Sequence, residues 1–368
     1  MKILYFAPIY YSDMKQRPQQ IAEFLSKDHQ IYYIEPTISF IRQLLKGGKS
    51  CIREQKKVND NLTVIRLNGC LTFHKSIEIL DLLGANNWWE LLQLGKLIQE
   101  CHFIWVGYSG WYTIIRHIKK KPIIFDKMDE EDMLVSSKIW KKTLQRNKRK
   151  MVEVSDVIIV TCQKFYEEIK KTGKPVYLIP NAVAEEFMEK TFQKNREYEE
   201  ITKVKRIGYI GTIGEWFDME IIEELLSINP EYEIILVGRN YLPENENPRV
   251  RYLGVKKNEE LPEIIKDFDV CLYNFKKSEL LDTINPVKVY EYLAANKPVL
   301  AVESVETLKL KPYLMIYNEK KEIGQWMSQP IKRPFRTEEE RKEFIRKNGW
   351  KARVQEINQI LSFVEEMK

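Results

Sequence analysis

The sequence is poor in the residues that hold metal ions or form disulfides. Its five cysteines stand apart without a CxxC pair, and its four histidines have no metal-ligand spacing. Scattered cysteines of odd number are typical of reduced, structural thiols, so neither a metal site nor a disulfide framework is predicted. The Asp-x-Asp triplet 267–269 precedes the apolar run 270–273 instead of following one. We interpret it as a turn between a helix and a strand.

Long hydrophobic runs and a dinucleotide-binding loop are also absent. No stretch approaches ~18 uncharged apolar residues, so we expect no membrane-spanning helix. Met1-Lys2 leads directly into ILYFAPIY without a small-residue cleavage site, which argues against a signal peptide and predicts a cytoplasmic protein. The loop 9–16 after this first predicted strand has no glycine. Without a G-x-G-x-x-G pattern there, NAD and FAD are not expected as cofactors.

What is present is the alternating pattern of an α/β protein. A length of 368 residues suggests about two domains. Short apolar strands alternate with helical patterns in both halves, which indicates parallel sheets with helices on both faces. We predict a first domain at 1–184, a second at 185–349 with a polar linker at its start, and a C-terminal helix at 350–368. The predicted strands are 2–8, 30–34, 62–67, 103–106, 122–125, 157–161, 176–179, 206–210, 233–237, 251–253, 270–273 and 299–302.

Positive charge is concentrated in the first half. Residues 1–185 carry 29 Lys and Arg against 20 Asp and Glu, whereas the remainder carries 30 against 33. This bias favours an anionic partner for the first domain. Segments 39–49, 71–83 and 138–150 combine apolar and basic residues, as membrane-surface segments do, although such runs are also common on solvated helices. No nucleic-acid-binding motif accompanies the charge, so nucleic acid is not expected.

The most informative stretch is LDTINPVKVYEYLAANKPVLAV, residues 281–302. Asn285 is a good N-cap, and Pro286 and Val287 suit the first helical turn, so a helix followed by a buried strand is predicted. The amide end of such a helix attracts a diphosphate, and Lys288 adds a positive charge. Glu291 lies one turn on, where its carboxylate could accept the hydroxyls of a ribose. The alternative is that Lys288 and Glu291 form an ordinary surface pair.

These residues resemble the donor-binding helix of the retaining glycosyltransferase group 1 family, which has the GT-B fold. In that family a glutamate opens the loop, a second follows eight positions later, and a GKPVV-like strand comes next. Glu291 matches the second glutamate and ANKPVL, residues 295–300, matches the strand entry. Thr283, with Asp282 beside it, stands where the first glutamate would be. The IPNAV segment 179–183 also resembles the IPNGV end of the family's first domain.

The resemblance implies two Rossmann-like domains with parallel sheets facing across a central cleft, and a C-terminal helix that crosses back to the first. It implies a retaining transfer without a metal or cofactor, from a UDP- or GDP-linked sugar. Its phosphate loop would be Gly211, Thr212 and Gly214, after the first strand of the second domain. The Arg and Lys that usually follow are replaced by EWFD, residues 215–218. Arg239 and Lys288 are therefore candidates for the missing charge, although Arg239 could equally be an exposed turn residue.

The first domain would hold the acceptor. Asp126 follows the predicted strand 122–125, and FDKMD resembles a family segment that presents a polar residue to the donor sugar. The alternative is that Asp126 caps a helix beginning near Glu130. Tyr10, Tyr11 and Arg17 are assigned to the acceptor side, with a simply packed loop as the alternative for each tyrosine.

The sequence thus predicts a hexosyltransferase that uses a saccharide or polyprenyl-linked saccharide acceptor in the synthesis of bacterial surface polysaccharide. It would be cytoplasmic or peripheral on the inner face of the membrane. Two alternatives remain open: a sugar-nucleotide 2-epimerase, and a catalytically inactive GT-B subunit that binds a nucleotide or a partner enzyme. The candidate catalytic residues are Asp126, Asp282, Lys288 and Glu291. The candidate donor-binding residues are Gly211, Thr212, Gly214, Arg239, Thr283, Asn285, Pro286, Val287, Lys288 and Glu291.

Overall fold

A computed structural model describes residues 1–39, 53–69, 85–135, 137–184, 187, 190 and 200–366. The chain divides into two compact units. Unit 1 consists of Met1–Pro180 and Val354–Lys368, and unit 2 of Asn181–Arg353. These boundaries lie within about four residues of the divisions expected from the sequence, and the end of the C-terminal helix belongs to unit 1.

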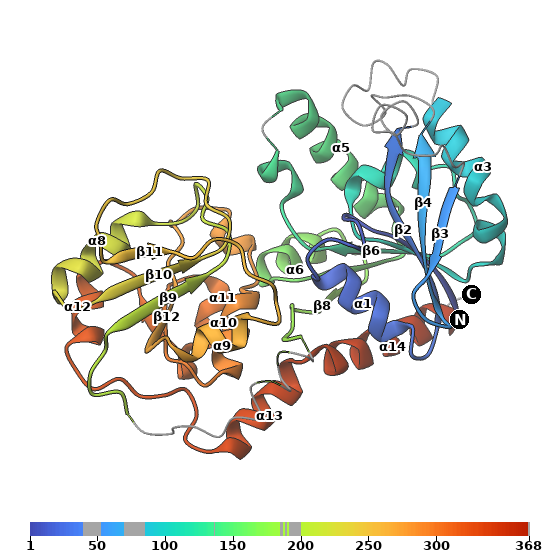
Figure 1. Cartoon of the computed structure of the whole chain (residues 1–368). Coiled ribbons are helices and arrows are strands. Elements are labelled where there is room, and N and C mark those ends of the chain that lie inside the picture. Colours follow the sequence, from blue (N-terminus) through green and yellow to red (C-terminus); the bar gives the residue numbers. More distant parts are fainter. Residues whose placement is uncertain are drawn as a thin grey trace. The chain divides into compact units, whose positions relative to one another are not determined.

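Unit 1 is built on an eight-stranded sheet (Figure 1). Its strands are, in spatial order, β3 (Arg53–Lys57), β4 (Leu62–Gly69), β2 (Gln30–Ser39), β1 (Lys2–Phe6), β5 (Phe103–Val106), β6 (Ile123–Lys127), β7 (Val157–Val160) and β8 (Val176–Leu178). Neighbours pair in parallel except β3, which runs antiparallel to β4. The sequence did not predict β3 because REQKK has no apolar residue; such charge is typical of an edge strand.

Helices cover both faces of this sheet. The helical segments of unit 1 are α1 (Arg17–Leu25), α3 (Ala85–Glu100), η2 (Ser109–Trp111), α4 (Tyr112–Ile115), η3 (Glu131–Leu134), α5 (Lys138–Val154), α6 (Gln163–Lys170) and most of α14 (Trp350–Glu366). One hydrophobic cluster joins α3, α4, α5 and α6 to the strands beneath them, which places these four helices on one face. None of the helices within the described ranges is long and apolar enough to cross a bilayer.

Unit 2 contains a six-stranded, fully parallel sheet. Its strands are, in spatial order, β11 (Val250–Tyr252), β10 (Glu233–Val237), β9 (Arg206–Ile210), β12 (Val270–Tyr273), β13 (Val299–Val302) and β14 (Met315–Tyr317). The chain fills one side of β9 first and then returns to fill the other, beginning with β12. This reversal of strand order is the place where open parallel sheets bind ligands, beyond the carboxyl ends of the strands.

The described helical segments of unit 2 lie mainly between its strands. They are α8 (Met219–Ile228), α9 (Leu261–Lys266), η4 (Leu281–Thr283), α10 (Val287–Ala294), α11 (Val305–Leu308), η5 (Lys311–Tyr313), α12 (Lys321–Met327) and α13 (Glu338–Asn348). The triplet 267–269 lies between α9 and β12, as predicted, and Asp269 accepts hydrogen bonds from the backbone of Lys205 and Arg206. Residues 258–260 form a turn that precedes α9.

Candidate functional site

The phosphate-binding loop predicted in unit 2 is held by a close approach of two glycines. Gly211 follows β9 and Gly238 follows β10, with φ values of +157° and +140°. A Cβ atom on Gly238 would lie 2.0 Å from the carbonyl oxygen of Gly211. The amide of Gly211 donates to Val237, and the amide of Ile213 donates to Arg239, both at 2.9 Å. Only glycine permits this packing, which fixes the two loops together at the carboxyl edge of the sheet.

Thr212 lies at the exposed crest of this loop. Its carbonyl accepts a hydrogen bond of 3.0 Å from the hydroxyl of Tyr209, whereas its N–H donates to no other described residue. Gly214 is buried, and a Cβ there would meet the ring of Trp216 at 2.7 Å. Thr212 therefore offers an amide to a phosphate, and Gly214 serves the turn.

The helix α10 begins at this same edge, but its cap differs from the prediction. The N-cap is Pro286, and no side chain bonds to the first turn. The side-chain Nδ2 of Asn285 donates to the carboxylate of Glu306 at 3.0 Å, and its side-chain oxygen accepts from the backbone N–H of Asn181 at 2.9 Å. The prediction that Asn285 caps the helix or contacts the donor is therefore wrong, because its side chain is buried in these contacts. In the first turn of α10, the N–H groups of Val287 and Val289 donate to backbone carbonyls, whereas the N–H of Lys288 has no partner among the described residues.

Lys288 and Glu291 form an ion pair of 2.8 Å on this helix. The side chain of Lys288 is 30% exposed and that of Glu291 is 12% exposed, so the pair is partly sheltered. The backbone N–H of Lys288 makes no hydrogen bond within the described residues. This residue thus combines an unused amide with a charged ammonium group. Tyr292 anchors the helix from behind, because its hydroxyl accepts from the N–H of Ile210 at 2.7 Å.

The two residues at the position of the missing family glutamate behave differently. Thr283 is 2% exposed, and its hydroxyl donates to the carbonyl of Leu280 at 2.7 Å. The side-chain hydroxyl of Thr283 is therefore already used within the protein, and a contact of this residue with the donor stays a prediction. Asp282 is partly exposed and has no hydrogen-bond or ion-pair partner among the described residues. It is the carboxylate that remains available at this position.

Arg239 is exposed just after β10, and its guanidinium donates to the hydroxyl of Tyr241 at 3.3 Å. Tyr241 is 65% exposed and was not predicted as a site residue. Its position two residues after Arg239 is the signal in the sequence that could have identified it. Asn181 and Glu306, which hold Asn285, were also missed. No local pattern could have identified them, because they are distant in sequence.

In unit 1, the expected role of Asp126 is corrected by its surroundings. Asp126 lies inside β6 rather than after it, and it is 0% exposed. It accepts hydrogen bonds from Arg17 at 2.9 to 3.2 Å, and Arg17 also donates to the carbonyls of Ile179 and Pro180. Asp126 therefore does not cap a helix, and the side chains of Asp126 and Arg17 are both held in buried contacts with each other. Each neutralises the buried charge of the other.

The acidic segment after β6 was not predicted as a site. Glu130 pairs with Lys127 at 3.0 Å and with Lys148, and Asp132 also pairs with Lys148, at 2.8 Å. Asp129 is exposed and has no hydrogen-bond partner among the described residues. It is the unpaired carboxylate at the carboxyl edge of this sheet.

Glu131 supplies a pH-dependent prediction. It accepts from the N–H of Ser109 at 3.0 Å and from the Ser109 hydroxyl, but burial still raises its pKa from 4.5 to about 7. A carboxyl whose pKa is higher in the folded state stabilises most below its unfolded pKa, and this contribution disappears as the pH rises through about 7. Glu131→Gln should therefore raise the melting temperature more at about pH 8 than at about pH 5.5.

The test is thermal unfolding of both proteins at the two pH values. Glu168→Gln is the control, because this exposed glutamate of α6 has no partner among the described residues. An equal effect of Glu131→Gln at both pH values would contradict the raised pKa.

The two tyrosines predicted to contact the acceptor already make contacts within unit 1. The hydroxyl of Tyr11 donates to Glu23 at 2.7 Å, its backbone N–H donates to Glu35, and its ring meets Tyr33 edge-on. Tyr10 lies beneath the guanidinium of Arg66, 5.2 Å from the ring centre. For Tyr11 these contacts match the packed-loop alternative, whereas Tyr10 keeps a partly exposed ring.

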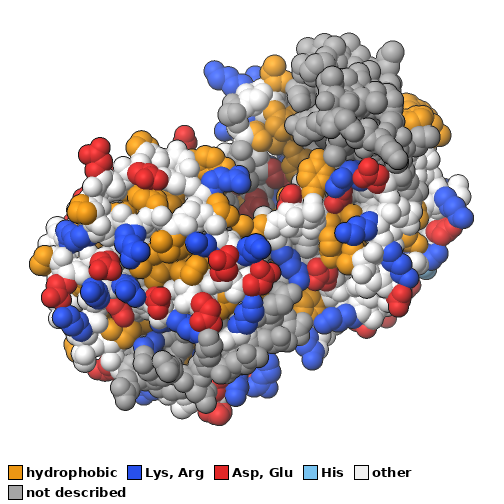
Figure 2. Space-filling view, viewed as in Figure 1, with side chains coloured by type: hydrophobic (Ala, Val, Ile, Leu, Met, Phe, Trp, Pro, Cys, Tyr) orange, Lys and Arg blue, Asp and Glu red, His pale blue; other side chains and the backbone are white. Residues whose placement is uncertain are grey.

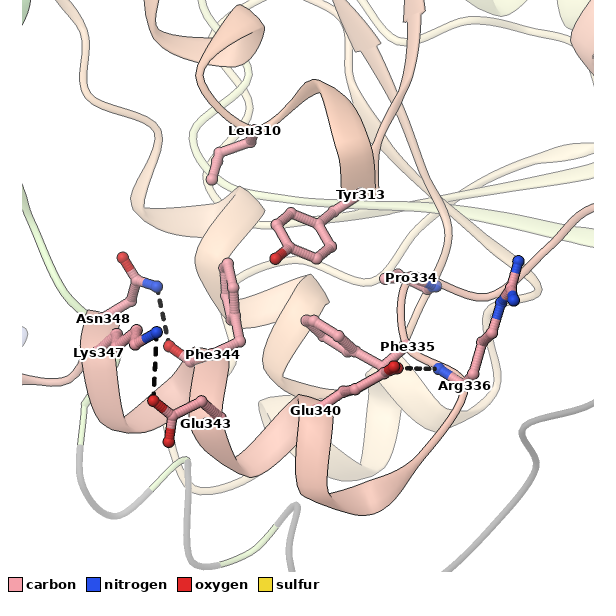
Figure 3. Close-up of a pocket in the computed structure, with 10 residues that line it drawn as sticks. All are labelled: Leu310, Tyr313, Pro334, Phe335, Arg336, Glu340, Glu343, Phe344, Lys347 and Asn348. Atoms are coloured by element: carbon pink, nitrogen blue, oxygen red, sulfur yellow. Dashed lines mark hydrogen bonds and ion pairs between the residues drawn. The ribbon is translucent and has the colours of Figure 1, made fainter.

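A cavity of about 610 Å³ lies elsewhere in unit 2, between α13 and η5. Tyr313, Phe335 and Phe344 form its aromatic floor, with ring centres 5.0 to 5.2 Å apart (Figure 3). None of the predicted site residues lines it. Among the described residues, no group of three or more His, Cys, Asp and Glu side chains could hold a metal ion.

The architecture of the two units defines the class of fold. Each unit is a sheet of parallel strands layered with helices, with β3 of unit 1 as an antiparallel edge strand, and the chain has the GT-B fold. Sucrose-phosphate synthase from Thermosynechococcus elongatus superimposes with a TM-score of 0.67 at 15% identity over 100% of both chains. An E. coli trehalose-6-phosphate protein bound to UDP-2-fluoro glucose gives 0.69 at 12% identity, over 98% of this chain and 99% of that one. Anabaena HepE with UDP and glucose gives 0.60 at 15% identity, over 98% and 99%.

One curated protein is similar in sequence. TuaH of Bacillus subtilis (strain 168), provisionally named a teichuronic acid biosynthesis glycosyltransferase, is 22% identical over 273 residues. The alignment covers 67% of this chain and 64% of TuaH. The chain therefore spans slightly less than two thirds of the length of this relative. No protein-family profile matches the sequence.

Proposed function

We propose that this protein is a glycosyltransferase that moves a sugar from a nucleoside diphosphate sugar to a saccharide or lipid-linked saccharide. The observation that carries the proposal is the uncapped first turn of α10 at the carboxyl edge of a parallel sheet. Lys288 stands in that turn, and the glycine-paired loop Gly211–Gly214 lies at the same edge. TuaH, which bears the name of a glycosyltransferase, and the UDP-containing structures of the same fold support this assignment.

The proposed donor site uses backbone amides and two cations. The amides of Thr212 and Lys288 and the dipole of α10 would receive the diphosphate, and the ammonium of Lys288 would turn from Glu291 towards it. Glu291 would then accept the ribose hydroxyls. Arg239, which is exposed, and Asp282, which is partly exposed, would contact the phosphate and the sugar respectively.

The proposed transfer retains the anomeric configuration and needs no cofactor. Amides, helix dipole and Lys288 would stabilise the negative charge that develops on the leaving diphosphate. The leaving phosphate would take the proton of the acceptor hydroxyl. We place the reaction in the synthesis of surface polysaccharide, as the name of TuaH suggests, and in the cytoplasm, where nucleotide sugars are made.

The direct test is donor hydrolysis by the purified protein. Incubation with UDP-glucose and with GDP-mannose should release UDP or GDP slowly in the absence of an acceptor. Release from one donor and not the other would identify the base. No release from a panel of sugar nucleotides, despite measurable nucleotide binding, would contradict the transferase assignment.

A second candidate is a catalytically inactive subunit that binds a nucleotide. The buried, internally bonded hydroxyl of Thr283 favours it, because the family has a glutamate at this position. The hydrolysis test separates the two candidates, since a binding module would bind UDP without releasing it from UDP-glucose.

Removal of Lys288 should weaken nucleotide binding. We expect Lys288→Ala to cost about 1.5–3 kcal/mol of UDP affinity, the scale of a charge-assisted hydrogen bond. Glu291→Gln should weaken uridine and UDP alike, because the ribose is common to both. Isothermal titration calorimetry measures these affinities.

Lys266→Ala is the matched control for this experiment. Lys266 forms the same kind of pair with Glu263, at 2.6 Å on α9 in the same unit. Its loss should leave UDP affinity unchanged. Equal effects of Lys288→Ala and Lys266→Ala would show that a general change of charge, and not phosphate contact, governs binding.

A further inference from the structure

The outer surface of one helical layer in unit 1 has an unusual composition. In this layer α4 packs between α3 and α5, on the face that the shared hydrophobic cluster joins to the sheet. The outward sides of these helices should carry mixed charges, as solvated amphipathic helices do. The visible surface of unit 2 has that mixture of Lys, Arg, Asp and Glu (Figure 2).

Helix α3 instead turns large apolar side chains outward. Trp88 is 64% exposed and Leu92, one turn further, is 71% exposed. Trp89 beside them is 36% exposed. Single exposed apolar residues are normal on a protein surface, but a tryptophan and a leucine four positions apart form a continuous ridge. The inward side of the helix is already satisfied by buried residues such as Leu94.

Helix α5 turns cations outward. Thr143, Leu144, Asn147 and Met151 are buried, so the opposite side carries Lys138, Lys142 and Arg149. These three cations make no hydrogen bond or ion pair with another described residue. In contrast, Lys148 and Lys150 on the same helix are paired with carboxylates. Ile139 is 65% exposed next to Lys138.

The turn after α4 adds positive charge and no carboxylate. Arg116, Lys119 and Lys120 are exposed in the turn after α4, and the ring of Trp88 lies 6.4 Å from that of His117. The acidic residues of α3 and α5 are buried or engaged: Glu90 is 1% exposed, Glu100 pairs with Lys2, and Glu153 pairs with Lys150.

We propose that this surface, defined by Trp88, Leu92, Lys138, Lys142 and Arg149 and called the cationic-aromatic face, binds a bilayer rich in anionic phospholipid. Unpaired cations attract the headgroups, and tryptophan with aliphatic side chains enters the interfacial layer. A nucleic acid would use the cations but leave Leu92 and Ile139 uncovered. The inference goes beyond the proposed transfer reaction and does not depend on it. Of the sequence-predicted membrane segments, 138–150 contributes to the face, and 40–49 and 71–83 lie outside the described residues.

Vesicle flotation of the full chain tests the proposal. The protein should float with phosphatidylcholine vesicles that contain phosphatidylglycerol, and remain behind with pure phosphatidylcholine. Lys138→Gln/Lys142→Gln/Arg149→Gln should lower the partition coefficient about 100-fold, because each surface cation contributes about a fivefold factor near an anionic membrane. Trp88→Ser/Leu92→Ser should lower it about 10-fold or more by removing the inserted side chains.

The control is Lys56→Gln/Lys332→Gln/Lys351→Gln. It removes three exposed cations that lie outside the cationic-aromatic face and have no partner among the described residues. It should float like the wild type. Equal losses in the control and test variants would overturn the proposal. So would RNA binding that competes with vesicles and is unaffected by Trp88→Ser/Leu92→Ser, since the face would then be a nucleic-acid site. Donor hydrolysis without lipid should be unchanged in every variant. The hydrolysis assay therefore tests the transferase assignment, and flotation tests membrane binding, independently of each other.

Discussion

Asp126→Ala should lower the free energy of unfolding of unit 1 by about 3–5 kcal/mol, the cost of removing one partner from a buried ion pair. The expected loss follows from the burial of both partners, because Asp126 is 0% exposed and Arg17 is 6% exposed. Without the carboxylate, the guanidinium would remain in the interior with only carbonyl acceptors at Ile179 and Pro180.

Calorimetry and amide exchange of β6 would measure this loss. Arg17→Met/Asp126→Leu should recover part of it, since an apolar pair carries no uncompensated charge. Asp60→Ala is the control, because Asp60 pairs with Lys57 on the exposed surface and its loss should leave the melting temperature unchanged. If Asp126→Ala kept its stability but lost transferase activity, Asp126 would act on a substrate and the structural role would be wrong.

This pair shows where the sequence was informative and where it was not. The strand ending near Asp126 was predictable from the run Ile123–Phe125, and so was a carboxylate at the functional edge. The partner was not, because Arg17 lies 109 positions away and no local pattern connects them. The same limit applies to Asn285. Its preference for capping was overruled by Asn181 and Glu306, which only the folded chain brings to it.

Local patterns were sufficient where the whole element is apolar or periodic. The α10–β13 stretch has both a helical period and a buried strand, and both formed as predicted. β3 has neither, since its REQKK sequence carries no apolar residue and pairs with β4 through its backbone and through an ion pair between Glu54 and Arg66. The loop after β9 was recognisable from Gly211 and Gly214, but Gly238 was not. Its importance comes from contact with Gly211, another effect of tertiary structure.

Gly238→Ala should therefore be among the most damaging single substitutions in unit 2. The new methyl group would lie 2.0 Å from the Gly211 carbonyl oxygen, on a backbone with φ of +140° that alanine rarely adopts. Strain and overlap together should lower the free energy of unfolding by about 3–5 kcal/mol. Separation of the loops should also weaken UDP binding about 10-fold or more, since the amide of Thr212 would move from the position proposed for it.

Gly324→Ala is the matched control, because a Cβ at this position in α12 meets nothing within 4 Å. It should bind UDP normally and gain up to about 1 kcal/mol of stability, since alanine is the better helix former. Thermal unfolding with and without UDP measures both effects. A Gly238→Ala protein that kept full UDP affinity would show that the diphosphate does not rest on the paired glycine loops, and the proposed donor site would then have to lie away from α10 as well.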